Sequence, residues 1–446
     1  MEFNLNTPAR DKEESDVGMS ESTGQTMAPQ LPRFFNRLLR LQAFEALRYR
    51  QFRLLWYGQN FASMGLWMDE VTRGWLIYEL TNSSLQLGLV RGIQAIPFIL
   101  LSPLAGSAAD RYSRKIQVIV AQVVNGLVYM ATALLILTHQ IKPWHVYVTA
   151  FLMATVQVFQ QPARSAMVSD VVPRKSLTNA IAHSAIVHNM ARSTGPALAG
   201  VLIALLGTGH TYAIQAVFYF LATHWTTRLT LPQRPSPGLA DHPSHRESLG
   251  KSIMEGWKVS WRVEEVRVGI ICVMLVDLVI VPFITLLPVF ARDILRVGAT
   301  GQGLLLTAMG VGALCSAVLL ATAGDRLPKG LLMMGSVIIY GFALVIFAAS
   351  TWFPLSLAMM AIAGLCTVHS HALVQTVIQC YSPPEFRGRT LALFHSSRVG
   401  TVLGSILIGS LSSLIGVKWV VASMGAIGAL TMMTIFVAMP RARLIR

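Results

Sequence analysis

The chain has 446 residues, of which 53% are hydrophobic and only 13% are charged, and this composition excludes an ordinary water-soluble domain. The formal net charge of +15 could indicate a nucleic-acid partner, but the basic residues lie in short clusters between apolar runs and form no patch or stripe. We therefore expect a membrane protein that contacts lipids and binds no nucleic acid.

Residues 1–32 are polar and rich in Ser, Thr, Glu and Gln, which predicts a disordered cytoplasmic tail. They lack the basic and then apolar layout of a secretory signal. In residues 33–51, Phe and Leu side chains lie at helical spacing beside Arg33, Arg37 and Arg40, which predicts an amphipathic helix on the inner leaflet surface. A plain cytosolic extension of the first span is the alternative.

Twelve apolar segments follow, each long enough to cross a bilayer as a helix of about 20 residues. They lie near residues 52–78, 86–109, 116–138, 145–163, 178–206, 211–228, 265–291, 301–323, 331–350, 353–380, 389–415 and 418–439. A loop rich in Pro, Ser and His predicts a cytoplasmic linker over 231–263. We expect an all-α membrane protein of two pseudo-symmetric six-helix bundles, over 52–230 and 264–440, with a cytoplasmic tail over 441–446.

The distribution of Lys and Arg predicts the orientation. Most of the 36 Lys and Arg residues lie in loops on the side that also holds the two termini. The opposite side holds only Lys142, Arg292, Arg296 and Lys418. By the positive-inside rule both termini are therefore cytoplasmic, which requires an even number of spans.

The two halves resemble each other, and several motifs resemble those of a known family. The second segment closes on Asp110-Arg111 and the eighth on Asp325-Arg326. The string GSAADRYSRK over 106–115 resembles the loop motif of the major facilitator superfamily. The strings PARSAMVSDVVPRKSLTNAIA and ARSTGPALAG resemble its branch of bacterial drug and siderophore exporters, which includes the enterobactin exporter, and the resemblance covers nearly all of 52–440.

The resemblance implies a gate at the cytoplasmic ends of the helices. Gly106 leads into Asp110, which would accept backbone hydrogen bonds from the start of the eleventh span near Thr390 and so latch the inner gate. Three bases after it would pair with acids or lipid phosphates, namely Arg111, Arg114 and Lys115. For Arg114 and Lys115, simple solvation is the alternative. The second copy of the motif, Asp325 and Arg326, is degraded, and we expect its loss to matter less.

A second motif lies in the fifth span. Gly195-Pro196 with Gly200 resembles the antiporter signature of the superfamily and implies a rigid bend that assists the rocking of the bundles. A packing role is an equal alternative.

Ionisable residues deep in a membrane span are costly and usually functional. The spans contain seven: Asp69, Glu70, Arg73, Arg91, Arg192, Asp277 and Arg398. We hypothesise that Asp69, Glu70 and Asp277 include the proton-coupling carboxylates, because a carboxyl group away from water binds a proton more readily. Arg73 follows Asp69 by one helical turn, so a permanent ion pair is the alternative for these acids.

The remaining buried cations carry weaker signals. Arg91 lies near the outer surface, where its side chain could reach the interface. Arg192 and Arg398, in repeat-related spans, could attract an anionic group of the substrate or tie helices together. We assign His369 and His371 to cavity lining or packing, because their spacing places them on different sides of a helix. We expect no metal site and no cofactor.

The preferred interpretation is a proton-coupled exporter of small amphipathic molecules, a siderophore or drugs, that works by alternating access in a bacterial inner membrane. Its partners would be the small-molecule substrate, protons or another coupling ion, and lipids, and it would act as a monomer. One alternative is an importer of a small anionic metabolite, and another is a receptor that transports nothing. The spans show no nucleophile beside a base and no metal cluster, so we do not expect an enzyme.

Overall fold

The computed structural model describes residues 42–231, 257, 261–323, 328–383, 386–440 and 443, and within these ranges it consists of helices with no strand. The tail over 1–32, residues 33–41 of the surface helix predicted over 33–51 and most of the linker over 231–263 lie outside the described residues. The domain boundaries therefore stay predictions.

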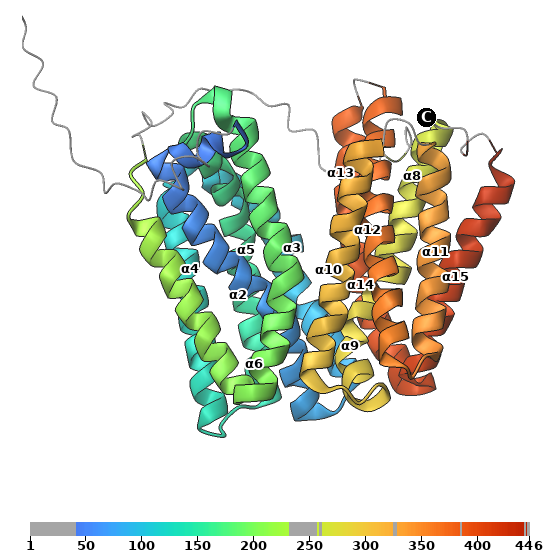
Figure 1. Ribbon diagram of the computed structural model, residues 1–446, viewed down its shortest axis with the longest axis horizontal. Helices are drawn as coiled ribbons and strands as arrows, with labels where there is room; N and C mark the ends of the chain where they lie inside the picture. Colours follow the sequence, from blue (N-terminus) through green and yellow to red (C-terminus); the bar gives the residue numbers. More distant parts are fainter. Residues whose placement is uncertain are drawn as a thin grey trace, which may run out of the picture.

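The N-terminal bundle begins with a short 3-10 helix and continues with five long helices (Figure 1). Its elements are η1 (Gln42–Arg48), α2 (Arg50–Thr81), α3 (Ser84–Arg111), α4 (Arg114–Leu137), α5 (Pro143–Asp170), η2 (Arg174–Ser176) and α6 (Leu177–Thr227). Gly207 divides α6 into two arms, because its φ of 83° and ψ of 168° are not helical. A positive φ favours glycine, and this break lies between the predicted fifth and sixth segments.

The C-terminal bundle contains one irregular helical path followed by regular helices. Its elements are α8 (Glu264–Leu275), η3 (Val276–Ile280), η4 (Val281–Leu286), α9 (Leu287–Val289), η5 (Phe290–Ile294), α10 (Gly298–Ala323), α11 (Lys329–Ala349), α12 (Phe353–Tyr381), α13 (Arg387–Ser396), α14 (Arg398–Ile415) and α15 (Val417–Ala438). In the path from α8 to η5 the chain changes from α-helix to π-helix at η3 and to 3-10 helix at η4. Pro282 and Pro288 lie within this path and lack the N–H that a regular helix would use.

Nine helical stretches of the described chain are long and apolar enough to cross a membrane. One of them, Arg174–Thr227, has 54 residues and contains the break at Gly207. The long helices α2 and α5 are not among the nine. The multi-pass architecture is thus confirmed, while the number twelve stays a prediction.

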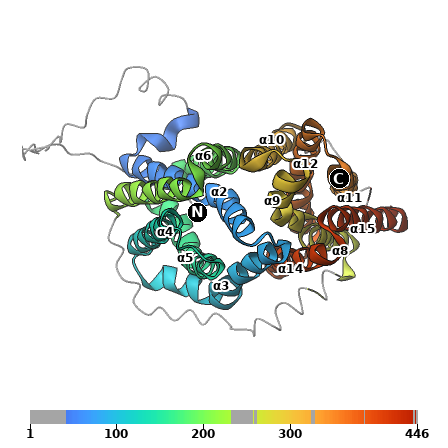
Figure 2. The same cartoon turned by 90° about the horizontal axis from the view of Figure 1, so that it is seen from below.

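The two bundles converge at one end and diverge toward the other, where η1 and the C-terminus lie (Figure 1). Seen along the helices, α2, α3 and α6 face α9, α10 and α14 (Figure 2). At the converging end, glycines allow the backbones of the two bundles to approach closely. A Cβ atom added to Gly88 would lie 2.6 Å from the Ser405 carbonyl oxygen. A Cβ atom added to Gly200 would lie 2.5 Å from the Ala299 carbonyl oxygen. Small residues therefore form much of the contact between the bundles.

Candidate functional site

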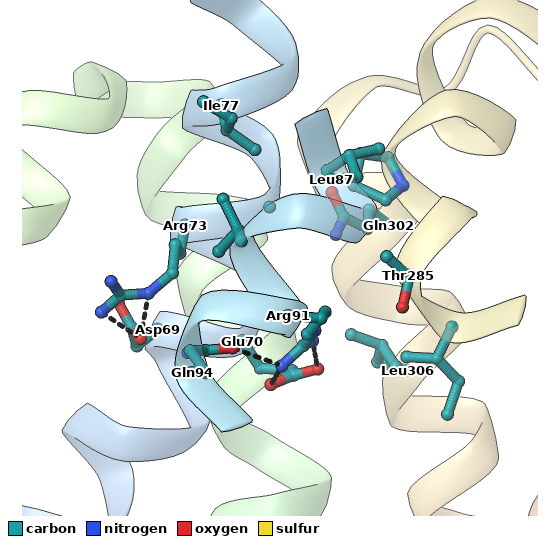
Figure 3. Close-up of a pocket in the computed structure, with 14 residues that line it drawn as sticks. Asp69, Glu70, Arg73, Ile77, Leu87, Arg91, Gln94, Thr285, Gln302 and Leu306 are labelled. Atoms are coloured by element: carbon teal, nitrogen blue, oxygen red, sulfur yellow. Dashed lines mark hydrogen bonds and ion pairs between the residues drawn. The ribbon is translucent and has the colours of Figure 1, made fainter. Parts of the chain in front are cut away.

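A pocket with about 440 Å³ of empty space lies between the bundles near the converging end (Figure 3). Its walls come from α2 and α3 on one side and from η4, α9 and α10 on the other. The lining residues are Asp69, Glu70, Arg73, Gly74, Ile77, Leu87, Val90, Arg91, Gln94, Ile284, Thr285, Pro288, Gln302 and Leu306. Four of the seven predicted span charges thus meet in one pocket that both bundles line.

Asp69 and Arg73 form a buried ion pair along one face of α2. The Arg73 Nε atom donates to Asp69 Oδ2 at 2.9 Å, and Arg73 and Asp69 are only 5% and 7% exposed. Arg73 also reaches α5, where its Nη1 atom lies 3.4 Å from Thr149 Oγ1. Asp69 Oδ1 is buried without a hydrogen-bond partner among the described residues. The geometry supports the structural alternative for this acid, while one oxygen remains able to take a proton.

Glu70 pairs with Arg91 and not with Arg73. Arg91 Nη1 donates to Glu70 Oε2 at 3.1 Å, and its Nη2 donates to the other carboxylate oxygen, so the contact is bidentate (Figure 3). Arg91 therefore lines the pocket and ties α3 to α2, whereas its sequence position suggested that it reaches the membrane surface.

Asp277 lies in the π-helix η3 and is held by two other segments of the C-terminal bundle. His371 Nε2 of α12 lies 3.0 Å from Asp277 Oδ1, and Ser397, at the junction of α13 and α14, donates to Asp277 Oδ2. The Asp277 side chain is 5% exposed, whereas that of His371 is 32% exposed. The acid is thus enclosed, and the imidazole connects it to the more open space.

The hydrogen bonds of His371 determine how many protons this pair holds. Its second ring nitrogen, Nδ1, lies 2.9 Å from the carbonyl oxygen of Thr367, so both nitrogens face oxygen atoms. A neutral imidazole carries a single N–H. Satisfying both contacts therefore needs one more proton, which resides on His371 or on Asp277. The geometry of the pair is therefore suited to sharing one exchangeable proton.

Sequence reasoning missed His371, because its partner is 94 residues away along the chain. The available signal was an isolated acid and a histidine in separate apolar spans, which does not reveal that they touch. The neighbouring His369 has a different environment, since it is buried and its Nδ1 atom contacts Ser316 of α10. Packing describes His369 well.

Arg192 and Arg398 lie on different bundles. The Arg192 guanidinium lies over the ring of Trp67, 5.4 Å from its centroid. Arg398 is exposed at the start of α14 and is near enough to interact electrostatically with Arg192. Within the described ranges, neither arginine forms an ion pair.

The predicted gating motif is described only in part. The side chains of Asp110 and Arg111 lie outside the described part of the structure, as do Asp325 and Arg326 entirely, and Gly106 lies within α3. Arg114 Nη1 pairs with Asp170 Oδ2 at 3.0 Å, and Lys115 Nζ donates to the Leu229 carbonyl oxygen at 2.6 Å. These two bases therefore bind protein groups, and the latch near Thr390 stays a prediction.

The glycine-proline motif of α6 lies between two neighbouring helices. A Cβ atom on Gly195 would lie 2.9 Å from Trp67 Cβ of α2, and one on Gly303 of α10 would lie 2.4 Å from the Pro196 carbonyl oxygen. Together with Gly200, these residues allow α6 to pack closely on both sides. The non-helical residue recorded in α6 is Gly207, and the bend at Pro196 remains a prediction.

No group of three or more His, Cys, Asp or Glu side chains that could hold a metal ion is found among the residues described by the structure. The cysteines Cys272, Cys315, Cys366 and Cys380 are free thiols. The side chains that line the site can form ion pairs and hydrogen bonds and can exchange protons.

The relatives found by comparison with known proteins include a transporter, an efflux pump and an exporter. The sequence model of the transmembrane secretion effector family matches residues 41–444. The staphyloferrin A transporter of Staphylococcus aureus is 23% identical over 374 residues, covering 81% of this chain and 89% of that protein. The multidrug efflux pump Tap of Mycobacterium tuberculosis is 26% identical over 372 residues, covering 81% and 87%. The enterobactin exporter EntS of Escherichia coli is 24% identical over 339 residues, covering 76% and 79%.

Solved structures show the same fold at low sequence identity. The nucleoside transporter NupG superposes with a TM-score of 0.66 at 15% identity, covering 87% of this chain and 99% of that one. A bacterial homologue of the lysosomal transporter Spinster, solved inward-facing and unoccupied, gives a TM-score of 0.64 at 15% identity, covering 91% and 97%. The expected all-helical fold of two bundles is therefore confirmed. The chain belongs to the transmembrane secretion effector family of major facilitator transporters.

Proposed function

We propose that this chain is a proton-coupled exporter of small amphipathic molecules, a siderophore or drugs, that works by alternating access as a monomer in a bacterial inner membrane with both termini in the cytoplasm. Family membership supports transport of a small molecule across a membrane. Export is supported by relatives that are an efflux pump and a siderophore exporter. Proton coupling is supported by the geometry of Asp277 and His371.

The contact between His371 Nε2 and Asp277 Oδ1, at 3.0 Å, is the single observation that carries the proposal. Ionisable groups inside a membrane are costly and are retained where they serve transport. When the proton leaves to water through the partly exposed imidazole, the single N–H of the neutral ring can serve only one of its two acceptors, Asp277 Oδ1 or the Thr367 carbonyl oxygen. Protonation therefore changes how firmly α12 and η3 are linked.

The irregular backbone around Asp277 would allow a change in the charge of Asp277 and His371 to move the helices that carry them. Asp277 lies in a π-helical stretch, and Ser397 occupies the junction between α13 and α14. Such stretches are frequent at functional sites because their backbone hydrogen bonds can rearrange. Two further groups interact electrostatically with the pair, Arg398 with His371 and Tyr340 of α11 with Asp277. The pair is thus placed to couple proton release to helix position.

The contacts between the bundles support alternating access. Tyr78 at the end of α2 donates a hydrogen bond to Asp293 of η5, and the Arg292 guanidinium lies 5.3 Å from the centroid of the same tyrosine ring. Thr300 Oγ1 donates to the Gly200 carbonyl oxygen at 3.3 Å. These contacts hold the converging end closed, and with cytoplasmic termini the diverging end faces the cytoplasm (Figure 1). In this arrangement the transported molecule would enter the space between the bundles from the cytoplasm.

Everted membrane vesicles test the proposal with probe dyes of different charge in place of the natural cargo. Vesicles containing the full chain are acidified inside, and the uptake of a cationic, a weakly basic and an anionic fluorophore is followed: ethidium, Hoechst 33342 and 1-anilinonaphthalene-8-sulfonate. We expect at least one to accumulate, and nigericin, which collapses the pH gradient, to release it. Vesicles without the chain are the control. Accumulation that persists after nigericin, or equal uptake by both kinds of vesicle for all three dyes, would contradict the proposal.

A further inference from the structure

Two basic side chains contact one tryptophan on the side of α6 that faces the other bundle, and two further arginines lie near them. The Arg192 guanidinium covers one side of the Trp67 ring, and the His188 ring meets that ring edge-on at 5.5 Å. Arg164 of α5 and Arg398 of α14 are near enough to act electrostatically on His188. We call Trp67, Arg164, His188, Arg192 and Arg398 the basic cluster.

The positive charge of the basic cluster is not neutralised by the described part of the protein. Arg164 Nη2 donates to the neutral side-chain oxygen of Gln161 at 2.9 Å, and Arg192 and Arg398 form no ion pair there. The acid that acts on Arg192 is Glu70, whose two carboxylate oxygens are both bound by Arg91. Uncompensated cations in a membrane protein are costly, so a negative group bound between these arginines would be stabilised by them.

A second observation also points to a ligand. The Trp67 Nε1 atom is buried and has no hydrogen-bond partner in the portion of the chain that the structure describes. Buried indole N–H groups usually find an acceptor, and a buried donor without an acceptor is unfavourable. An anionic molecule lying against Trp67 would supply the acceptor as well as the countercharge, and a flat apolar part of it would pack on the ring.

The basic cluster includes residues of both bundles. Trp67, Arg164 and Arg192 belong to the N-terminal bundle, and Arg398 begins α14 of the C-terminal bundle. Next to Arg192, Ser193 packs against Gly310 of α10, so this part of α6 borders the opposite bundle. A group that binds Arg192 and Arg398 together would therefore link the two halves, as substrates do in transporters built from repeats.

We propose that the basic cluster binds the transported molecule and selects an organic anion with a flat apolar part, such as an aromatic carboxylate. Arg192 and Arg398 bind the carboxylate, and Trp67 holds the ring. This inference rests on the proposed function, since it names the substrate class of the same transporter. It predicts that a cation of the same shape is rejected, because the cluster repels positive charge.

Matched probes of opposite charge test the inference in the full chain purified in detergent. Equilibrium dialysis compares 2-naphthoate with (2-naphthyl)methylammonium, which share one ring system. We expect naphthoate to bind and the ammonium ion not to bind. Arg192→Gln and Arg398→Gln should each weaken naphthoate binding about tenfold or more, since each removes a charge-assisted hydrogen bond to the carboxylate. Arg192→Lys keeps the charge without the fork-shaped donor and should weaken binding less.

Arg228→Gln is the control, because Arg228 also lies over a tryptophan, 5.7 Å from the centroid of Trp225, but outside the cluster. It should bind naphthoate as the parent does. Equal binding of both probes, or unchanged binding by Arg192→Gln and Arg398→Gln, overturns the inference. Dialysis involves no proton gradient. If the dialysis result overturns the inference while vesicles still show gradient-driven uptake of a dye, the proposed function stands and only the substrate class is wrong.

Discussion

At the scale of the residue, the sequence reveals which side chains are exceptional but not which of them meet. An acid or arginine within an apolar span stands out on composition alone, and the seven predicted charges all lie on described helices. Their partners depend on how helices pack. Packing brings Arg91 to Glu70, and it brings Asp277 to His371, which sequence reasoning assigned to cavity lining or packing.

The role of His371 can be separated from that of its neighbour by substitution. His371→Gln removes the second titratable group of the pair, so we expect proton-driven uptake in everted vesicles to be lost and the exchange of cargo to become nearly independent of pH. His369→Gln changes a histidine of the same helix that contacts Ser316, and it should retain both properties. Unchanged gradient-driven uptake by His371→Gln would remove the residue from the mechanism.

The pair of Asp69 and Arg73 predicts a cost in stability. Asp69→Asn leaves the guanidinium of Arg73 buried without its countercharge, and removing one member of a buried pair costs about 3–5 kcal/mol. The double variant Asp69→Asn, Arg73→Gln removes the charge as well and should recover much of the loss. Thermal unfolding of the purified protein measures both. Equal melting temperatures for Asp69→Asn and the parent would show that the pair contributes little.

At the scale of the element, apolar length predicts where helices lie but not how regular they are. The predicted segment 265–291 agrees in position with the path from α8 to η5, yet that path contains π and 3-10 turns. The predicted segment 389–415 is interrupted at Ser397. Hydropathy averages over a span, so it cannot detect a change in hydrogen-bond register. Pro282 and Pro288 were the local signal of irregularity.

Glycine contacts between α6 and α10 predict how the converging end opens. Gly200→Val would place side-chain atoms against the Ala299 carbonyl oxygen, and overpacking of this kind costs about 1–3 kcal/mol. The ratio of the closed state to the separated state should fall by about tenfold. Spin labels on Gln140→Cys and Thr351→Cys, in a background with the native cysteines replaced, would report a longer distance across this end. Gly335→Val is the control, since a Cβ atom there meets nothing within 4 Å, and an equal distance in both variants would contradict the prediction.

At the scale of the whole molecule, alternation of apolar segments and positive loops was enough to predict two helix bundles, because lipid imposes both patterns. It could not predict which end is closed. That depends on a few contacts at the converging end, including Tyr78 with Asp293 and the close approach of Gly88 to Ser405. The membrane side of the termini stays a prediction, and the shared position of η1 and the C-terminus agrees with it (Figure 1).

If a proton held by Asp277 and His371 drives transport, loss of the carboxylate should separate accumulation from exchange. In vesicles containing Asp277→Asn, net accumulation of a transported dye driven by a pH gradient is measured beside the exchange of labelled for unlabelled dye without a gradient. The matched control is Glu265→Gln, an acid in the first turn of α8, on the same helical path. We expect Asp277→Asn to lose gradient-driven accumulation while exchange continues, and we expect the control to keep both. Gradient-driven accumulation at the parental rate in Asp277→Asn would contradict it.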